Sequence, residues 1–276
     1  MKSTVTSIYK CLLRDAALLK DTPHFRLRAP LRLDQWGRGD FLSASVDNSK
    51  KRLEDFHGLE DIFASKNNSF QDIEHRTDGD ASILVDRIYE IIRQGFRQNA
   101  HISDSNMIAS KLDEAIRALQ ELSNQLLLAK CSSVSVTKGI CVEATSQHVD
   151  NSSADQNLYR FAYRITITNN NEEHPYQIIG RQYTFKSVSG QRIALPRGSP
   201  GIVGCTPILF PGQTFQYTSG VEINAPLGSA SGVLHTISKA SHVDESEEAA
   251  FDVLVSPFSL IAPSAIRAYH NATGMV

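Results

Sequence analysis

The stretch of the chain whose residue types most suggest chemistry is a glycine-rich loop at 198–204. Glycine loops bind phosphate groups through backbone N–H groups, usually where a helix begins directly after the loop. Here Pro207 and a strand-like run follow, and Pro200 removes one backbone donor. We therefore expect a tight loop between two strands, with phosphate binding as the alternative.

Arrangements typical of catalysis or metal binding do not occur in the sequence. It contains no His-Glu-x-x-His motif and no Walker lysine, and the string at 228–232 has alanine where a Gly-x-Ser-x-Gly motif has its nucleophile. Four histidines lie on different predicted strands or loops, and an acidic run is expected at a solvated loop tip. These residues are His148, His174, His235 and His242, and Asp244, Glu245, Glu247 and Glu248. We expect no catalytic residue, no metal site and no cofactor of the protein's own.

Composition narrows the choice of partners and compartment. The formal net charge of −2 gives no general attraction to nucleic acid or to an anionic membrane. No apolar run approaches the roughly 20 residues that a membrane span needs. The four cysteines are scattered, with no Cys-x-x-Cys pair, which favours a reducing compartment over a disulfide framework or a zinc site. We therefore expect neither a nucleic-acid partner nor a membrane span.

The first half of the chain has the hydrophobic period of amphipathic helices. Apolar residues recur at three- and four-residue steps in 4–20, in the segment that opens after Asp80 and in the segment that starts near Ser103. Three such helices can enclose a small bundle core. We predict a helical domain over residues 1–130.

Residues 22–79 do not continue the helical pattern. They hold the only tryptophan, Trp36, a basic and aromatic run at 25–32 and a charged patch at 50–55. A structureless segment of this length is rare inside a compact domain and is usually functional or disordered. We predict a solvated, partly disordered insertion within the helical domain.

The second half alternates with period two, most purely at 159–168, which indicates a half-buried strand. A first strand is expected through 134–142, bent or bulged at Lys138-Gly139. Further strands are expected at 176–185, 191–195, 214–219, 232–237, 251–255 and 258–261. Short strands separated by regular turns predict an antiparallel β-sandwich over 131–265, followed by a tail at 266–276. The fold class is thus α+β with two domains.

Several motifs follow one another along this second half. A Tyr-x-Phe-x-Tyr-x-Ile-x-Ile strand at 159–167 precedes Gln-Ile-Ile-Gly-Arg at 177–181 and the glycine loop, and then come Pro-Gly-x-x-Phe-x-Tyr-x-Ser-Gly at 211–220 and Ala-Pro-Leu-Gly at 225–228. In this order they resemble the ApaG family, which implies a fibronectin-III-like sandwich. In bacterial members the loop reads Gly-x-Gly-x-x-Gly and has been proposed to hold pyrophosphate. Ser199, Gly201 and Gly204 stand at the corresponding positions here, with Pro200 inserted between the first two.

Short motifs in the first half carry a second resemblance. Ile8-Tyr9-Lys10 precedes Leu12-Leu13-Arg14, and Phe96-Arg97-Gln98-Asn99 ends the second predicted helix. In a three-helix context they resemble the LYR-motif (complex 1 LYR-like) family of small mitochondrial adaptors. This implies binding of the mitochondrial acyl carrier protein, whose acyl-phosphopantetheine arm would enter the bundle and whose recognition helix is acidic. The residues expected at this interface are Tyr9, Lys10, Arg14, Arg93, Phe96 and Arg97.

These features predict a non-catalytic adaptor in the mitochondrial matrix, which binds acyl carrier protein through its helices and a further protein complex through its ApaG-like half. The first twenty residues carry Lys2, Lys10 and Arg14 and no acid before Asp15. Mitochondrial targeting helices have this pattern, and so do amphipathic helices of mature proteins. The alternatives are a cytoplasmic location, a substrate-recognition module for a protease or ubiquitin ligase, and a phosphate- or nucleotide-binding protein that uses the glycine loop.

Overall fold

The chain divides into two compact units, each described here by itself. The computed structural model describes residues 2–22, 28, 30–31, 33–42, 81–149, 158–239 and 250–265. The first unit consists of Met1–Ala29 and Ser45–Ala129, and the second of Pro30–Ala44 and Lys130–Val276. Residues 30–44 therefore belong with the second unit, whereas the sequence placed all of 1–130 in the helical domain.

Some segments singled out in the sequence lie outside the described residues. They are most of the run at 25–32, the charged patch at 50–55, His242, the acidic run at 244–248 and the tail at 266–276. The predictions made for them stay predictions.

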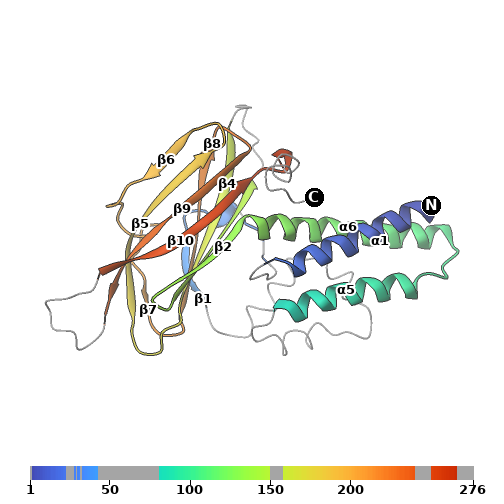
Figure 1. The fold of residues 1–276 in the computed structure, drawn as a ribbon, viewed down its shortest axis with the longest axis horizontal. Helices are drawn as coiled ribbons and strands as arrows, with labels where there is room; N and C mark the ends of the chain where they lie inside the picture. The colour runs from blue at the N-terminus through green and yellow to red at the C-terminus, as the bar shows by residue number, and fades with distance from the viewer. Residues whose placement is uncertain are drawn as a thin grey trace. The chain divides into compact units, whose positions relative to one another are not determined.

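The described part of the first unit contains the three predicted helices. They are α1 (Lys2–Lys20), α5 (Ala81–Gln98) and α6 (Ser105–Lys130), which lie side by side in Figure 1. The start of α6 is set by Asp104, whose Oδ1 accepts a hydrogen bond of 2.8 Å from the backbone N–H of Met107. An acid in this N-cap position satisfies a helix donor that would otherwise have no partner.

Apolar side chains from all three helices form one core. The buried members are Leu12, Ala16, Leu19, Ile88, Ile91, Ile92, Ala118, Leu122 and Ala129. Asp15 is also buried, at 4% exposure, and its carboxylate accepts hydrogen bonds from Arg14 Nη2 at 2.9 Å and Ser123 Oγ at 3.0 Å. A buried carboxylate is costly unless it is paired in this way, so Asp15 links α1 to α6 through a bond that the sequence does not reveal.

The second unit is an antiparallel β-sandwich, as predicted. The first sheet has the order β1-β8-β4-β3-β2 and the second the order β10-β9-β5-β6, with β7 paired to β5. The first sheet consists of β1 (Gly39–Leu42), β8 (Thr214–Ile223), β4 (Tyr159–Asn169), β3 (Ile140–Val149) and β2 (Ser132–Thr137). The second consists of β10 (Ala250–Ile261), β9 (Leu227–Ser238), β5 (Tyr176–Ser187), β6 (Arg192–Leu195) and β7 (Ile208–Leu209). Short 3-10 helices occupy Leu33–Gln35 and Pro263–Ala265.

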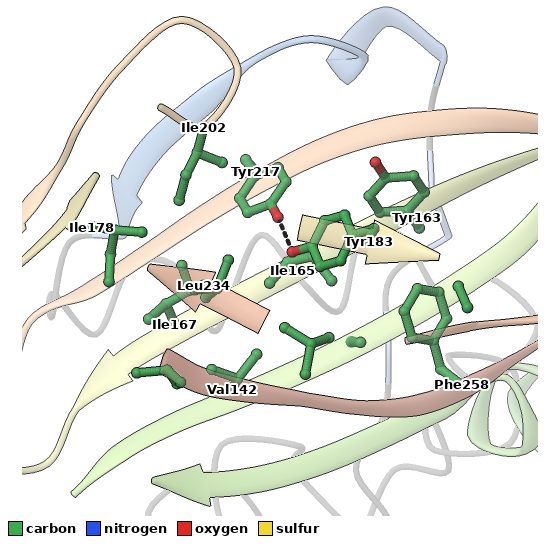
Figure 2. Packing of buried hydrophobic residues seen from close by; sticks show 14 of the residues in the cluster. Val142, Tyr163, Ile165, Ile167, Ile178, Tyr183, Ile202, Tyr217, Leu234 and Phe258 are labelled. Atoms are coloured by element: carbon green, nitrogen blue, oxygen red, sulfur yellow. Dashed lines mark hydrogen bonds between the residues drawn. The ribbon is translucent and has the colours of Figure 1, made fainter. Parts of the chain in front are cut away.

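Strand β4 lies in the middle of the first sheet and carries the centre of the core. Phe161, Ile165 and Ile167 are completely buried, and Tyr163 is 3% exposed. Buried side chains of the second sheet, among them Tyr183, Leu234 and Phe258, pack between the two sheets with them (Figure 2). Each such side chain stabilises the fold by about 1.5–3 kcal/mol relative to an exposed one. The alternation at 159–168 is therefore confirmed as one face of a core strand.

The expected single strand through 134–142 is wrong. Lys138 and Gly139 have φ angles of 47° and 75°, and β2 and β3 pair on either side of them as a hairpin. Two successive positive φ angles are typical of a type I′ turn, which reverses the chain instead of bending it. The two expected strands near the C-terminal end are instead one strand, β10, with a register shift between Val255 and Phe258.

One side of the sandwich is closed by hydroxyl side chains. Ser133 Oγ donates to the carbonyl of Ser256 at 2.8 Å, and Ser135 Oγ donates to the carbonyl of Leu254 at 2.6 Å. In return, the N–H of Leu254 donates to Thr137 Oγ1 at 3.1 Å. These bonds join β2 of the first sheet to β10 of the second. They occupy backbone groups that the open edge of β10 would otherwise expose.

The described residues of 30–42 form a strap on the outer face of the first sheet. Leu31 N–H donates to Gln147 Oε1 at 2.7 Å, and Gly37 N–H donates to the carbonyl of Thr218 at 2.9 Å. Strand β1 then pairs along β8. Between these two attachments lies the indole of Trp36, against Gly220. The strap was predicted as part of an insertion in the helical domain, and its sequence has no strand-like alternation.

Gly220 is the residue that makes room for Trp36. A Cβ at this position would lie 2.0 Å from Cζ2 of the indole, closer than any real contact. A glycine inside a strand often marks such a close approach of another group. On the neighbouring strand Ala162, which pairs with Gly220, is also small.

We expect Gly220→Ala to displace the strap. The added methyl should push the indole away from the sheet and destabilise the protein by about 1–3 kcal/mol, as overpacking does. Trp36 is the only tryptophan, so its emission should shift to longer wavelength and become more accessible to iodide quenching. Gly95→Ala is the matched control, because a Cβ at Gly95 meets nothing within 4 Å. Unchanged emission in Gly220→Ala would contradict the packing described for the strap.

Candidate functional site

The helical unit brings together two aromatic residues that the sequence proposed for one interface. The rings of Tyr9, from α1, and Phe96, from α5, have centroids 4.8 Å apart and an interplanar angle of 44°. Both side chains are partly buried against the helical core. Tyr9 precedes the buried Leu12 by one turn, and Phe96 follows the buried Ile92 by one turn. The aromatic pair therefore closes one end of the contact between α1 and α5.

The four cations predicted for this interface differ in how they are held. Arg14 is 67% exposed and pairs with Asp15 at 2.9 Å. Arg93 pairs with Glu90 at 3.1 Å and lies over the ring of Tyr89. Lys10 and Arg97 are exposed, and neither forms an ion pair within the described residues. Lys10 and Arg97 are thus the cations whose charge is not already balanced.

The pair of Arg14 and Asp15 also has a structural role. The hydrogen bond from Asp15, followed by its negative charge, raises the pKa of Arg14 above its usual value. Because Asp15 is buried, removing Arg14 would leave a buried carboxylate with Ser123 as its remaining partner among the described residues. A substitution of Arg14 would therefore test folding together with binding.

The glycine loop lies between β6 and β7 and is held as a tight turn. Ile202 and Cys205 exchange backbone hydrogen bonds of 2.7 and 3.0 Å. Between them Val203 and Gly204 have φ angles of 44° and 84°, the pattern of a type I′ turn. A positive φ is unfavourable for a β-branched residue such as Val203, but its side chain is packed against the core. This apolar contact offsets the backbone strain.

The backbone donors of this loop are largely used by the loop itself. Gly201 N–H donates to the carbonyl of Ile179 at 2.9 Å, and Ser199 N–H donates to the carbonyl of Pro196 at 3.3 Å. The N–H groups of Ile202 and Cys205 are engaged in the turn. No helix begins after Gly204, where β7 follows instead. The geometry therefore favours a loop that connects strands over a phosphate cradle at Ser199, Gly201 and Gly204.

Comparison with known proteins assigns the second half of the chain. Residues 149–238 match the family model of the ApaG domain. The protein ApaG of Pectobacterium carotovorum is 34% identical over 129 residues, which cover 46% of this chain and 95% of the relative. The protein ApaG of a Methylobacterium species is 36% identical over 135 residues, which cover 49% of this chain and 96% of the relative.

The chain belongs to the ApaG family. A solved structure of the ApaA protein from Bordetella pertussis is also similar, with 30% identity, coverage of 49% of this chain and 97% of the other, and a TM-score of 0.39. The ApaG domain match at 149–238 includes β4 to β9 and the glycine loop. It does not include the helical unit, so the LYR-like character of α1 and α5 stays a prediction.

Sequence analysis missed Arg181, the ApaG-domain residue with the most unusual surroundings. Arg181 lies two positions before the buried Tyr183 on β5 and faces the interior with it. Its guanidinium lies 5.8 Å from the centroid of the Tyr217 ring on the opposite sheet. Its Nε and Nη1 are buried and have no hydrogen-bond partner among the described residues. An unpaired buried cation of this kind is costly and uncommon.

A β-bulge explains why the alternation did not reveal Arg181. The register of β5 against β9 shifts between Ile178 and Gly180. Counting by twos from the buried Ile178 would put Arg181 on the outer face, but the extra residue moves it to the inner face. The one available signal in the sequence was that the apolar positions switch from even to odd numbers between Ile178 and Tyr183, with a glycine between them.

A second polar cluster lies on the outer face of the same sheet. His235 Nδ1 lies 2.7 Å from Asp252 Oδ1, and Arg197 Nη2 donates to the same oxygen at 3.2 Å. His235 Nε2 is buried and has no partner among the described residues. The sequence had left open whether its histidines converge; His174 is exposed near Glu173, and His148 packs against Tyr159 and Phe161.

The described residues contain neither a cluster of potential metal ligands nor a helix that could span a membrane. No group of three or more His, Cys, Asp or Glu side chains in this part of the chain could hold a metal ion. No helix in it is long and apolar enough to cross a membrane.

Three tyrosines line the interior beside Arg181. Tyr183 and Tyr217 are joined by a hydrogen bond between their hydroxyl groups across the two sheets (Figure 2). Burial raises the pKa values of Tyr163, Tyr183 and Tyr217, because the phenolate would lose its hydration. The nearby charge of Arg181 opposes this shift without cancelling it.

These shifts predict a loss of stability in alkali. Unfolded tyrosines ionise near pH 10, whereas the buried ones keep their protons to higher pH. Their contribution is therefore fully present below pH ~10 and is lost as the pH rises above it, by about 1.4 kcal/mol per pH unit for each tyrosine. Urea unfolding between pH 8 and 12 should show this decline.

Tyr183→Phe combined with Tyr217→Phe isolates the pair. All other ionisable groups are the same in the two proteins. The difference in the slope of their unfolding free energy against pH therefore reports the two buried hydroxyl groups. The unfolding free energy of the double variant should fall less steeply with pH. The difference in slope should correspond to about two protons. Identical slopes would mean that the two hydroxyl groups ionise as readily in the folded protein as in the unfolded chain.

Proposed function

We propose that this protein is a non-catalytic adaptor, which binds an acyl carrier protein through its helical unit and a second protein through its ApaG domain. The observation that supports the first part is the contact of Tyr9 with Phe96, at 4.8 Å between ring centroids. Residues from the two motifs that resemble LYR proteins lie far apart in the sequence and meet here. The exposed Lys10 and Arg97 are their chain neighbours.

Charge supports an acidic partner at this place. Lys10 follows Tyr9 and Arg97 follows Phe96 in the sequence, so each of the two helices carries an exposed cation within one turn of the aromatic pair. Neither cation has an ion-pair partner within the described residues, so both are available to carboxylates of another protein. Complementary charges of this kind accelerate association and select the partner more than they add affinity.

The apolar core of the helices supports an acyl ligand. The aromatic pair is only partly buried and lies next to fully buried residues of α1 and α5. A fatty chain that entered beside Tyr9 and Phe96 would replace contacts among these side chains. Burying roughly ten methylenes at ~0.8 kcal/mol each would contribute up to about 8 kcal/mol before the cost of parting the helices.

The mitochondrial matrix is the compartment that fits this proposal, because the carrier proteins of LYR adaptors are found there. A reducing compartment is also compatible with the cysteines, which are all free. Burial raises the pKa of Cys131 to about 12, so this thiol is held in its unreactive form.

Charge reversal at the unpaired cations tests the proposal. Full-length protein carrying Lys10→Glu and Arg97→Glu should bind an acylated acyl carrier protein at least tenfold more weakly, about 1.4 kcal/mol, because attraction becomes repulsion. Both residues are exposed and have no ion-pair partner among the described residues, so the helix content by circular dichroism should not change. Binding of the unmodified protein should weaken with salt, as the Debye length falls from ~10 Å at 0.1 M to ~3 Å at 1 M.

The ApaG domain supplies a matched control. Lys186→Glu with Arg192→Glu reverses two exposed cations that pair in register on β5 and β6. This control should bind the carrier as the unmodified protein does. Phe96→Ala should weaken binding of the acylated carrier more than that of the carrier with a bare phosphopantetheine arm. Retained binding in the Lys10 and Arg97 variant would remove the carrier protein from the proposal.

A further inference from the structure

We propose that Arg181 of the ApaG domain binds a carboxylate group of a partner polypeptide. Its Nε and Nη1 are buried without a hydrogen-bond partner among the described residues. The third guanidinium nitrogen, Nη2, is not among these buried atoms, and the residue as a whole is half-buried. The guanidinium therefore lies at the rim of the interior, where a group from solvent can reach it. This inference does not rest on carrier-protein binding by the helical unit.

The position of Arg181 is imposed by the fold. Pairing places it opposite Leu234 on β9, whose side chain is completely buried. The charge of Arg181 acts on Tyr163, Tyr183 and Tyr217 and on the thiol of Cys205 in the glycine loop. It thus lies between the two sheets, beneath the end of that loop. A cation held there without a counter-ion loses hydration that only a ligand or water can replace.

Acidic side chains of the described residues do not balance this charge. Asp40 on β1 is close enough to act on the Cys205 thiol, as Arg181 is. Yet Arg181 Nε and Nη1 have no hydrogen-bond partner, Asp40 included, in the part of the chain that the structure describes. The one described contact of the guanidinium is the ring of Tyr217, which accepts charge weakly compared with a carboxylate.

The donors that remain free define the ligand. The backbone N–H groups of Ser199, Gly201 and Ile202 are engaged within the loop and its neighbouring strand. The hydroxyl groups of Tyr183 and Tyr217 are bonded to each other. Of these groups, only the guanidinium keeps donors without a partner, with one positive charge and a planar fork of N–H groups. This set matches a monovalent planar carboxylate held by two hydrogen bonds, whereas a phosphate dianion would leave oxygens and charge unsatisfied.

A carboxylate of this kind comes from a polypeptide in two ways, as a C-terminus or as an Asp or Glu side chain. Both present the same two oxygens to Arg181. They differ in whether binding survives amidation of the terminus, and this difference separates them by experiment.

The first test uses acetate and the full-length protein. Arginine Nε–Hε signals are followed by NMR while sodium acetate replaces sodium chloride at constant ionic strength. One signal, assigned to Arg181 by its absence in Arg181→Met, should shift and saturate. Thermal unfolding of the unmodified protein should move to higher temperature over the same range of acetate. If no arginine signal responds in a saturable way, the proposal is wrong.

The second test compares three short peptides of one sequence. One has a free C-terminus, one is amidated, and one is amidated with an internal glutamate. A C-terminal ligand predicts that the first binds at least tenfold more tightly than the other two. A side-chain ligand predicts that the third binds at least tenfold more tightly than the second. Equal affinity of all three would overturn the proposal.

Variants separate binding from a purely structural role. Arg181→Met should abolish the response to acetate, and Arg181→Lys should weaken it at least tenfold, since an ammonium group cannot offer two fixed parallel donors. Arg192→Met, which removes an exposed arginine of β6, should respond as the unmodified protein does. Without acetate, Arg181→Met should be no less stable than the unmodified protein. Lower stability of this variant, with no effect of acetate on the unmodified protein, would assign Arg181 a packing role only.

Discussion

The second unit depends above all on covering the inner face of β4. Phe161, Ile165 and Ile167 are completely excluded from solvent, and a single sheet cannot achieve this by itself. A second sheet must therefore pack against the first, and its inward-facing residues fill the space between the two sheets. The hydroxyl pair of Tyr183 and Tyr217 satisfies the polar ends of two large side chains that fill it. Two of the side chains that bury the inner face of β4 therefore also form the hydrogen bond that joins the two sheets.

The sandwich closes its two open sides by different means. Serine and threonine side chains of β2 join it to β10 along one side and occupy backbone groups of β10. On the other side the strap adds β1 to β8, and the glycine loop lies over β5. The unpaired Arg181 is found on this second side.

The helical unit and the ApaG domain expose two different kinds of chemistry. The contact of Tyr9 with Phe96 combines apolar surface with the cations Lys10 and Arg97, which suits an acidic protein that carries an apolar chain. Arg181 offers one half-buried cation and a fork of donors, which suits one carboxylate. Both arrangements suit binding, which is the function proposed for each of them.

By itself the sequence determined the elements whose signal is local. Helices α1, α5 and α6 follow from apolar residues at helical spacing, and β4 follows from alternation at 159–168, because each pattern reports one face of one segment. The order of motifs also identified the ApaG half. The sequence could not show that Trp36 packs on Gly220 or that Arg181 faces the interior. Those positions depend on which distant strand lies opposite and on the bulge at Gly180 that changes the parity of β5, and only the tertiary structure decides which segments meet.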